Sequence, residues 1–127
     1  MDILLDTHAV WWFFVDDERL PKSATEIICK PENKKYVSIA SLWEVAIKMS
    51  IGKLHFDGGI ERFIEAIEEN SFLLLEVDPE HIKAVSNLPL IHRDPFDRML
   101  VAQAMIENIS IMTIDTNILK YDITSIW

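Results

Sequence analysis

Cysteine is almost absent from this chain, in which Cys29 is the only thiol. A single cysteine cannot form an internal disulfide, so the composition gives no sign of an oxidising compartment. Long apolar runs are also missing, since none approaches the roughly 20 residues that cross a bilayer. The first residues, MDILLD, lack the basic region and the apolar stretch of a signal peptide. We therefore expect a cytoplasmic protein that is not embedded in a membrane.

Basic residues are scarce as well. The chain has 12 Lys and Arg against 21 Asp and Glu, which gives a formal net charge of −9. A protein that binds nucleic acid by counterion release is expected to be basic, so the overall charge argues against passive nucleic-acid binding. An acidic site that contacts phosphate through a bound cation is still allowed, because the cation reverses the local field.

Several common site motifs are missing. There is no glycine-rich phosphate loop, which excludes P-loop and Rossmann sites, and the histidines show no HxH or HExxH spacing for zinc. His92 and Arg93 precede an acidic motif, where they are either phosphate contacts or solvated surface residues. The same two interpretations apply to Lys48 and Arg98.

The length and the hydrophobic content are those of one domain. Half of the 127 residues are hydrophobic, and no repeat or linker divides the chain, so residues 1–127 are expected to share one core. Short apolar runs predict strands at residues 3–5, 35–38, 71–77, 109–114 and 123–127. Helical spacing and Pro or Gly boundaries predict helices at residues 9–15, 20–30, 39–51, 59–70, from 79 onward, 95–107 and, as a turn or short helix, 117–120.

This alternation of strands and helices predicts an α/β fold with a mainly parallel sheet, covered by helices on both faces. The three consecutive leucines at residues 73–75 predict a strand that is buried on both faces. In such folds a ligand binds outside the carboxyl ends of the strands. Acidic residues near those ends are therefore candidates for a site.

Four acids occupy such places. Asp6 directly follows the first predicted strand, and Asp115 directly follows the fourth. Glu44 lies in the first turns of the helix after the second strand, and Asp97 lies in the first turn of the helix before the fourth. Carboxylates that converge in this way need protons or a cation to relieve their repulsion. Mg²⁺ or Mn²⁺ prefers oxygen ligands, and metal-assisted hydrolysis is the chemistry that follows.

Each of these acids also has a structural interpretation. An aspartate after a strand is often a turn former or a helix cap, and Asp94, before Pro95, has the pattern of an N-cap. Glu44 and Lys48 are spaced to form an i,i+4 ion pair. Their helix is otherwise apolar apart from Ser41, so this narrow polar stripe predicts a polar pocket or an ion pair between helices.

Two adjacent tryptophans, Trp11 and Trp12, lie in the apolar segment 9–15. Neighbouring side chains on a helix point about 100° apart, so both indoles are not expected to face one core. We expect one of them in the core and the other at a protein interface, where aromatic residues are enriched.

Four segments together resemble the PIN-domain ribonucleases, and more narrowly the VapC-type toxins of prokaryotic type II toxin–antitoxin systems. These segments are LLDTHAVWW, SIASLWEVAIKMSIGKL, HRDPFDRMLVAQA and MTIDTNI, and they cover nearly the whole chain in the family's order. The resemblance implies a five-stranded parallel sheet in the order 3-2-1-4-5. It also implies cleavage of single-stranded RNA that depends on Mg²⁺ or Mn²⁺, a homodimer, and inhibition by a small antitoxin protein.

The resemblance also assigns roles to residues. It implies that the metal-binding, catalytic acids are Asp6, Glu44, Asp97 and Asp115. Asp94 becomes an acid outside this ligand set, and the polar supports are Thr7, Ser41 and Asn117.

Two other functions fit parts of the same pattern. A phosphoacceptor receiver domain shares the length, the acidity and a carboxylate pocket on a parallel sheet, although it carries adjacent acids after its first strand, where Asp6 stands alone. A catalytically silent binding module with the PIN fold is the other alternative, and the presence of all four acids counts against it.

Overall fold

Five parallel strands form the centre of the fold in the order β3-β2-β1-β4-β5, as expected from the resemblance. The computed structural model describes all of residues 1–127. The strands are β1 (Asp2–Leu5), β2 (Lys34–Ser38), β3 (Leu73–Leu75), β4 (Ser110–Met112) and β5 (Ser125–Ile126). Receiver domains have the order 2-1-3-4-5 instead. The observed order therefore excludes the receiver alternative.

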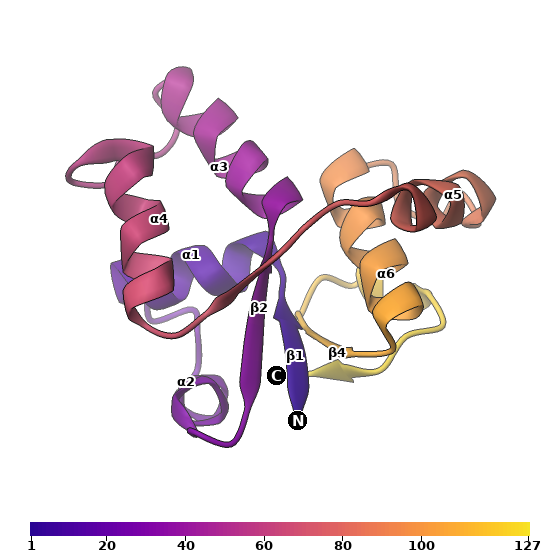
Figure 1. Ribbon diagram of the computed structural model, residues 1–127, viewed down its shortest axis with the longest axis horizontal. Coiled ribbons are helices and arrows are strands. Elements are labelled where there is room, and N and C mark those ends of the chain that lie inside the picture. Colours follow the sequence, from indigo (N-terminus) through magenta and orange to yellow (C-terminus); the bar gives the residue numbers. More distant parts are fainter.

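Helices connect the strands and cover both faces of the sheet (Figure 1). They are α1 (Thr7–Val15), α2 (Lys22–Cys29), α3 (Ile39–Ser50), α4 (Gly59–Glu69), α5 (Pro79–Asn87), α6 (Pro95–Glu107) and the 3-10 turn η1 (Ile118–Lys120). In Figure 1, α1, α2 and α4 lie on one side of the central strands, whereas α5 and α6 lie on the other. None of these helices has the length and apolar content needed to cross a membrane.

Alternate residues of the central strand β1 divide the core into two parts. Ile3 and Leu5 pack with α1 to α4 on one face, whereas Leu4 packs with α6, β4 and η1 on the other. All three side chains are fully buried. A central parallel strand that is covered on both faces reads as a continuous apolar run, which explains why the strand ILL was recognisable in the sequence.

The prediction that the three leucines of β3 are buried on both faces is wrong. Leu73 is 44% exposed, and Leu74 and Leu75 are only half-buried. β3 pairs with β2 alone and forms an edge of the sheet, so fewer elements cover it. Strands β3, β4 and β5 are also shorter than predicted, because residues at both ends of each predicted strand lie outside the sheet.

The prediction that Trp11 and Trp12 do not face one core is also wrong. Trp12 is buried, and Trp11 is half-buried with its ring against Phe56 and Phe63. Other residues cover most of the circumference of helix α1, so the indoles of Trp11 and Trp12 both lie in apolar surroundings. The exposed tryptophan is Trp43 on α3, at 64%.

Matched substitutions in β1 and β3 test the two environments of leucine. We expect Leu4→Ala to lower the free energy of unfolding by about 2–5 kcal/mol, because it leaves a cavity beside α6. The same change at Leu73 should cost less than about 1 kcal/mol, since much of that side chain is already in water. Urea unfolding followed by circular dichroism measures both values, and equal costs would contradict the assignment of β3 to an exposed edge.

Candidate metal centre

The reversal of strand order between β1 and β4 creates the place for a site. The chain runs outward from β1 to β2 and β3, then returns to β4 on the other side of β1. Helices leave the two halves of the sheet in opposite directions at this point, which opens a crevice outside the carboxyl ends of the strands. Asp6 follows β1 and Asp115 lies three residues beyond β4, so both acids belong to this crevice.

Asp6 is fixed at the start of α1. Its backbone N–H donates to the Met112 carbonyl oxygen at 3.1 Å, and its Oδ1 accepts from the Ala9 N–H at 2.7 Å as the N-cap of the helix. The carboxylate is buried. Beside it, the Thr7 hydroxyl donates to Ser41 Oγ at 2.9 Å and so links α1 to α3. The predicted supports Thr7 and Ser41 therefore bond to each other at the base of the crevice.

Asp97 and Asp115 are brought together by a histidine. His92 Nε2 lies 2.9 Å from Asp97 Oδ2 and 3.7 Å from Asp115 Oδ2. The Asp94 N–H donates to Nδ1 of the same ring at 3.3 Å. Because Nδ1 accepts, a neutral imidazole carries its proton on Nε2 and donates it to Asp97. His92 is thus part of the acidic cluster, which settles its two interpretations against simple surface solvation.

Glu44 reaches the cluster from α3, a helix that contacts both α1 and α6. Its Oε2 pairs with Lys48 Nζ at 2.9 Å, as the i,i+4 spacing indicated. Its Oε1 is buried and has no hydrogen-bond partner. A buried carboxylate oxygen without a partner carries a desolvation cost, so this atom is one that a ligand or cation would satisfy.

The charges of these acids act on one another. Burial, followed by the charges of Asp94, Glu44, Asp115 and Asp6, raises the pKa of Asp97 to about 8. Burial also raises the pKa of Asp6, against the hydrogen bonds from Thr113 and Ala9 that lower it. Without a cation the cluster therefore holds protons at neutral pH, as expected for like charges in a confined space.

This donor set fits a divalent cation. A ligand atom from each of His92, Asp97 and Asp115 lies within 4.8 Å of the others. Asp6 and Glu44 act on Asp97 from the neighbouring elements, and Glu44 supplies the unpartnered oxygen. Carboxylate oxygens are the ligands that hard divalent cations take, and a bound cation would remove the repulsion that raises the pKa of Asp97.

The remaining predicted residues have varied places. Asp94 is the N-cap of α6, with Oδ1 accepting from the Phe96 and Asp97 N–H groups at 2.9 and 3.0 Å. The Asn117 N–H donates to Asp115 Oδ1 at 2.8 Å and helps to orient that carboxylate.

Arg98 does not offer its guanidinium to the cluster. Its nitrogens donate to the carbonyl oxygens of Val85 and Pro89 and to the Tyr121 hydroxyl, at 3.0–3.1 Å. The Tyr121 hydroxyl in turn accepts from the His92 N–H at 2.9 Å. Arg98 therefore holds the loop that carries His92, and these bonds support neither the phosphate contact nor the solvated surface position.

A second group of possible ligands has a structural explanation. His81 is buried, its Nδ1 accepts from the Asp78 N–H at 3.1 Å, and its Nε2 lies 3.1 Å from Glu107 Oε2. Both ring nitrogens are thus occupied in capping α5 and joining it to the end of α6.

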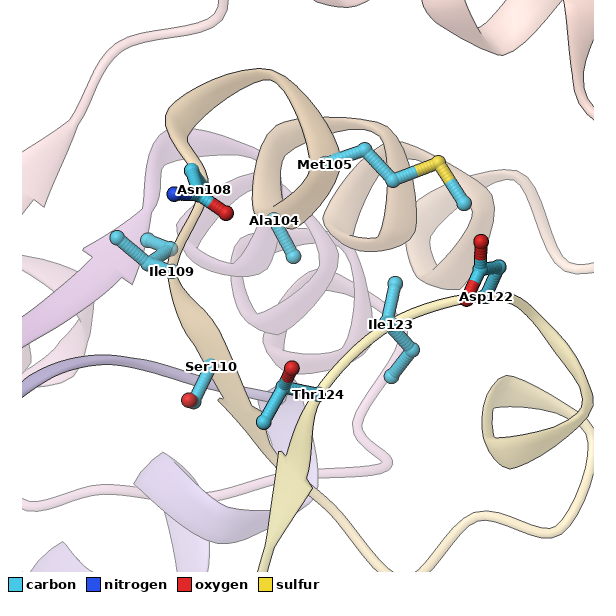
Figure 2. A pocket seen from close by; sticks show the side chains of 8 residues that line it. All are labelled: Ala104, Met105, Asn108, Ile109, Ser110, Asp122, Ile123 and Thr124. Atoms are coloured by element: carbon cyan, nitrogen blue, oxygen red, sulfur yellow. The ribbon is translucent and has the colours of Figure 1, made fainter.

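A cavity of about 280 Å³ lies at the opposite edge of the sheet (Figure 2). Its walls come from the end of α6, the start of β4 and the segment before β5, including Asn108, Ser110 and Asp122. The amino ends of parallel strands meet there, so this cavity is separate from the acidic cluster.

Comparison with known proteins identifies the family. The PIN domain matches this chain over residues 3–123. The chain belongs to the PIN-domain family. No curated protein sequence matches it.

Solved structures share the PIN-domain fold over nearly their whole length. VapBC2 from Rickettsia felis, bound to a DNA fragment from its promoter, has a TM-score of 0.76 at 14% identity and covers 100% of this chain and 99% of its own. VapBC-1 from nontypeable Haemophilus influenzae has a TM-score of 0.67 at 18% identity, with 99% and 97% covered. FitAcB from Neisseria gonorrhoeae has a TM-score of 0.67 at 17% identity, with 98% and 96% covered.

In this PIN domain the crowding of acids predicts an unusual pH dependence. The carboxyl group of Asp97 has a pKa of about 8 in the folded chain against an ordinary value of 3.8, so the folded state binds more protons between these values. By linkage, the free energy of unfolding in EDTA should fall as pH rises from about 4 to about 8. We expect the free energy of unfolding of Asp97→Asn to decline less with pH. Near pH 8 it should be higher than that of the wild type by more than about 1.4 kcal/mol, which is the equivalent of one pKa unit.

Urea unfolding at several pH values measures this effect. Asp122→Asn is the matched control, because Asp122 is exposed at the opposite edge of the sheet. Its pH profile should parallel that of the wild type. A decline as steep in Asp97→Asn as in the wild type would show that another group causes it.

Proposed function

We propose that this PIN domain is a metal-dependent endoribonuclease that hydrolyses phosphodiester bonds in single-stranded RNA. We also propose that it is the toxin of a toxin–antitoxin pair and acts in the cytoplasm. The observation that supports hydrolysis is the set of carboxylates from four elements around Asp97, whose pKa they and burial raise to about 8. Four acids that occupy separate elements and repel one another are costly to the fold, so a function that needs them accounts for their presence.

A divalent cation at this site would lower the pKa of a bound water and neutralise charge on the phosphoryl group. Asp6, Glu44, Asp97 and Asp115 would hold it. Mg²⁺ or Mn²⁺ is the proposed ion, because the donors are mainly carboxylate oxygens.

Other side chains of the chain position this ligand set. The Asn117 N–H fixes Oδ1 of Asp115, which leaves Oδ2 free to face the cluster. The Nε2–H of His92 orients Oδ2 of Asp97. Lys48 offsets part of the negative charge on Glu44. Fixed ligands of this kind reduce the reorganisation that the reaction requires.

The proposed substrate and partners follow from the family. One structure of similar fold, from Klebsiella pneumoniae, is described as a toxin–antitoxin complex. We infer that a small antitoxin protein inhibits this chain as well.

Replacing an acid of the cluster tests the activity. We expect Asp97→Asn to lower the rate of RNA cleavage by about 100-fold or more, because even substitutions beyond the metal ligands typically cost 10- to 100-fold. Cleavage of total RNA with Mg²⁺ or Mn²⁺, with and without EDTA, measures this rate. Asp122→Asn should cleave like the wild type.

Isothermal titration with Mn²⁺, together with the cleavage assay, distinguishes a silent binding module from an active site that lies elsewhere. A wild-type chain that binds Mn²⁺ and cleaves no RNA would support the silent binding module. A folded Asp97→Asn chain that cleaves at the wild-type rate would show that the acidic cluster is not the active site.

We further propose that the chain forms a homodimer through α3. Trp43, Ile47 and Ile51 are exposed at 64%, 39% and 60%. Their spacing of four residues places Trp43 and Ile47 on one face of α3, and Ile51 follows as its C-cap. Trp43 also packs edge-on against Phe96 of α6 and lines an apolar cavity of about 440 Å³. Such contiguous apolar surface marks a protein interface.

A charge on this stripe should separate the subunits. We expect a dimer for the wild type and a monomer for Ile47→Asp, because the carboxylate would be buried without a partner in the interface. Light scattering coupled to size-exclusion chromatography measures the mass. Leu119→Asp, at another exposed apolar position, should remain a dimer. A dimer of Ile47→Asp would place the interface elsewhere.

A further inference from the structure

A second cavity, of about 320 Å³, adjoins the acidic cluster. Asp6 and Asp115 form part of its wall, and the aromatic residues His8, Trp12 and Trp127 form another part. Its size is at the lower end of the range of about 300–1,000 Å³ for small-molecule sites. The cavity therefore combines two of the proposed metal ligands with an aromatic surface.

The aromatic side chains of this cavity come from both ends of the chain. Trp12 is the buried member, and the His8 ring stacks on it with 5.4 Å between ring centroids and 28° between planes. Trp127 meets Trp12 edge-on, at 6.0 Å and 77°. His8 is exposed and Trp127 is half-buried. Trp12 thus supports two rings that are still accessible from the cavity.

This combination matches the chemistry of a nucleotide. Phosphate is the group that a cation held by Asp6 and Asp115 would contact, whereas the flat faces of aromatic rings bind bases by stacking. The apolar cavity beside Trp43 offers no such pair, because it is lined almost wholly by hydrophobic residues.

We propose that the cavity between α1 and the segment after β4 binds one nucleobase of the substrate, stacked on Trp127 and His8, next to the phosphate that is cleaved. This inference rests on the proposed function for the identity of the substrate. Every base has a π-face, so the site accepts all four bases and favours the larger purines. It would select unpaired bases, because a base inside a duplex is already stacked on its neighbours.

Fluorescence of an RNA that contains 2-aminopurine tests the site without depending on cleavage. The emission of this base falls when it stacks on an aromatic ring. We expect a short single-stranded RNA with 2-aminopurine to be quenched by the wild-type chain in Mg²⁺ at early times after mixing. Trp127→Leu should abolish most of the quenching, and Trp127→Phe, which keeps a π-face, should retain it.

Kinetics give a second measure once the wild-type cleavage site in a test RNA is mapped. We expect removal of the base beside the scissile phosphate to lower kcat/KM by about 5- to 150-fold in the wild type, the range for stacking of one base. The same removal should have no further effect in Trp127→Leu. Phe56→Leu is the matched control, since Phe56 is a half-buried aromatic residue that packs on Trp11 and Phe63 and does not line the cavity.

The outcomes separate this inference from the proposed function. Cleavage by the wild type with equal quenching by folded Trp127→Leu and wild type would overturn the base site and leave the nuclease intact. Quenching that requires Trp127, without cleavage of any RNA, would support the base site and count against the nuclease. Absence of quenching in the wild type would overturn the base site whatever the activity.

Discussion

Repulsion among buried carboxylates is the constraint around which the carboxyl edge of this sheet is organised. Burial and four neighbouring acids raise the pKa of Asp97 to about 8, a cost that only the rest of the fold can offset. Local groups reduce that cost: the N-cap bond to Asp6, the pairing of Lys48 with Glu44 and the contact of His92 with Asp97. The apolar core on both faces of β1 supplies the remaining stability.

The sequence predicted those acids whose place depends on a strand end. Asp6 and Asp115 could be assigned because parallel strands end at one edge of a sheet, and a buried strand is visible as an apolar run. Asp94 could be assigned as a cap because an aspartate before proline at a helix start has a local physical reason. The strand order came from family resemblance, since periodicity alone does not say which strands are neighbours.

The role of His92 was not fixed by the sequence, because it depends on contacts far along the chain. The loop that carries it is held by Tyr121, whose hydroxyl bonds the His92 N–H and the Pro89 carbonyl oxygen. Trp127 reaches Trp12 only because β5 pairs with β4 and β4 pairs with β1. The burial of β3 was overestimated because the run of leucines was interpreted from its composition alone, and an edge strand can be as apolar as a central one.

The net charge of −9 then limits how such a protein can bind RNA. Counterion release gives little affinity to an acidic chain, so the attraction must come from short-range contacts. Under the proposed function these are a cation at the acidic cluster and stacking beside it. Stacking on a protein ring requires a base that is not already stacked in a helix, so preference for single strands follows from the way in which the substrate is held. Under the proposed function, an acidic nuclease gains selectivity for unpaired bases, because its net charge of −9 gives little attraction to the phosphates of a duplex.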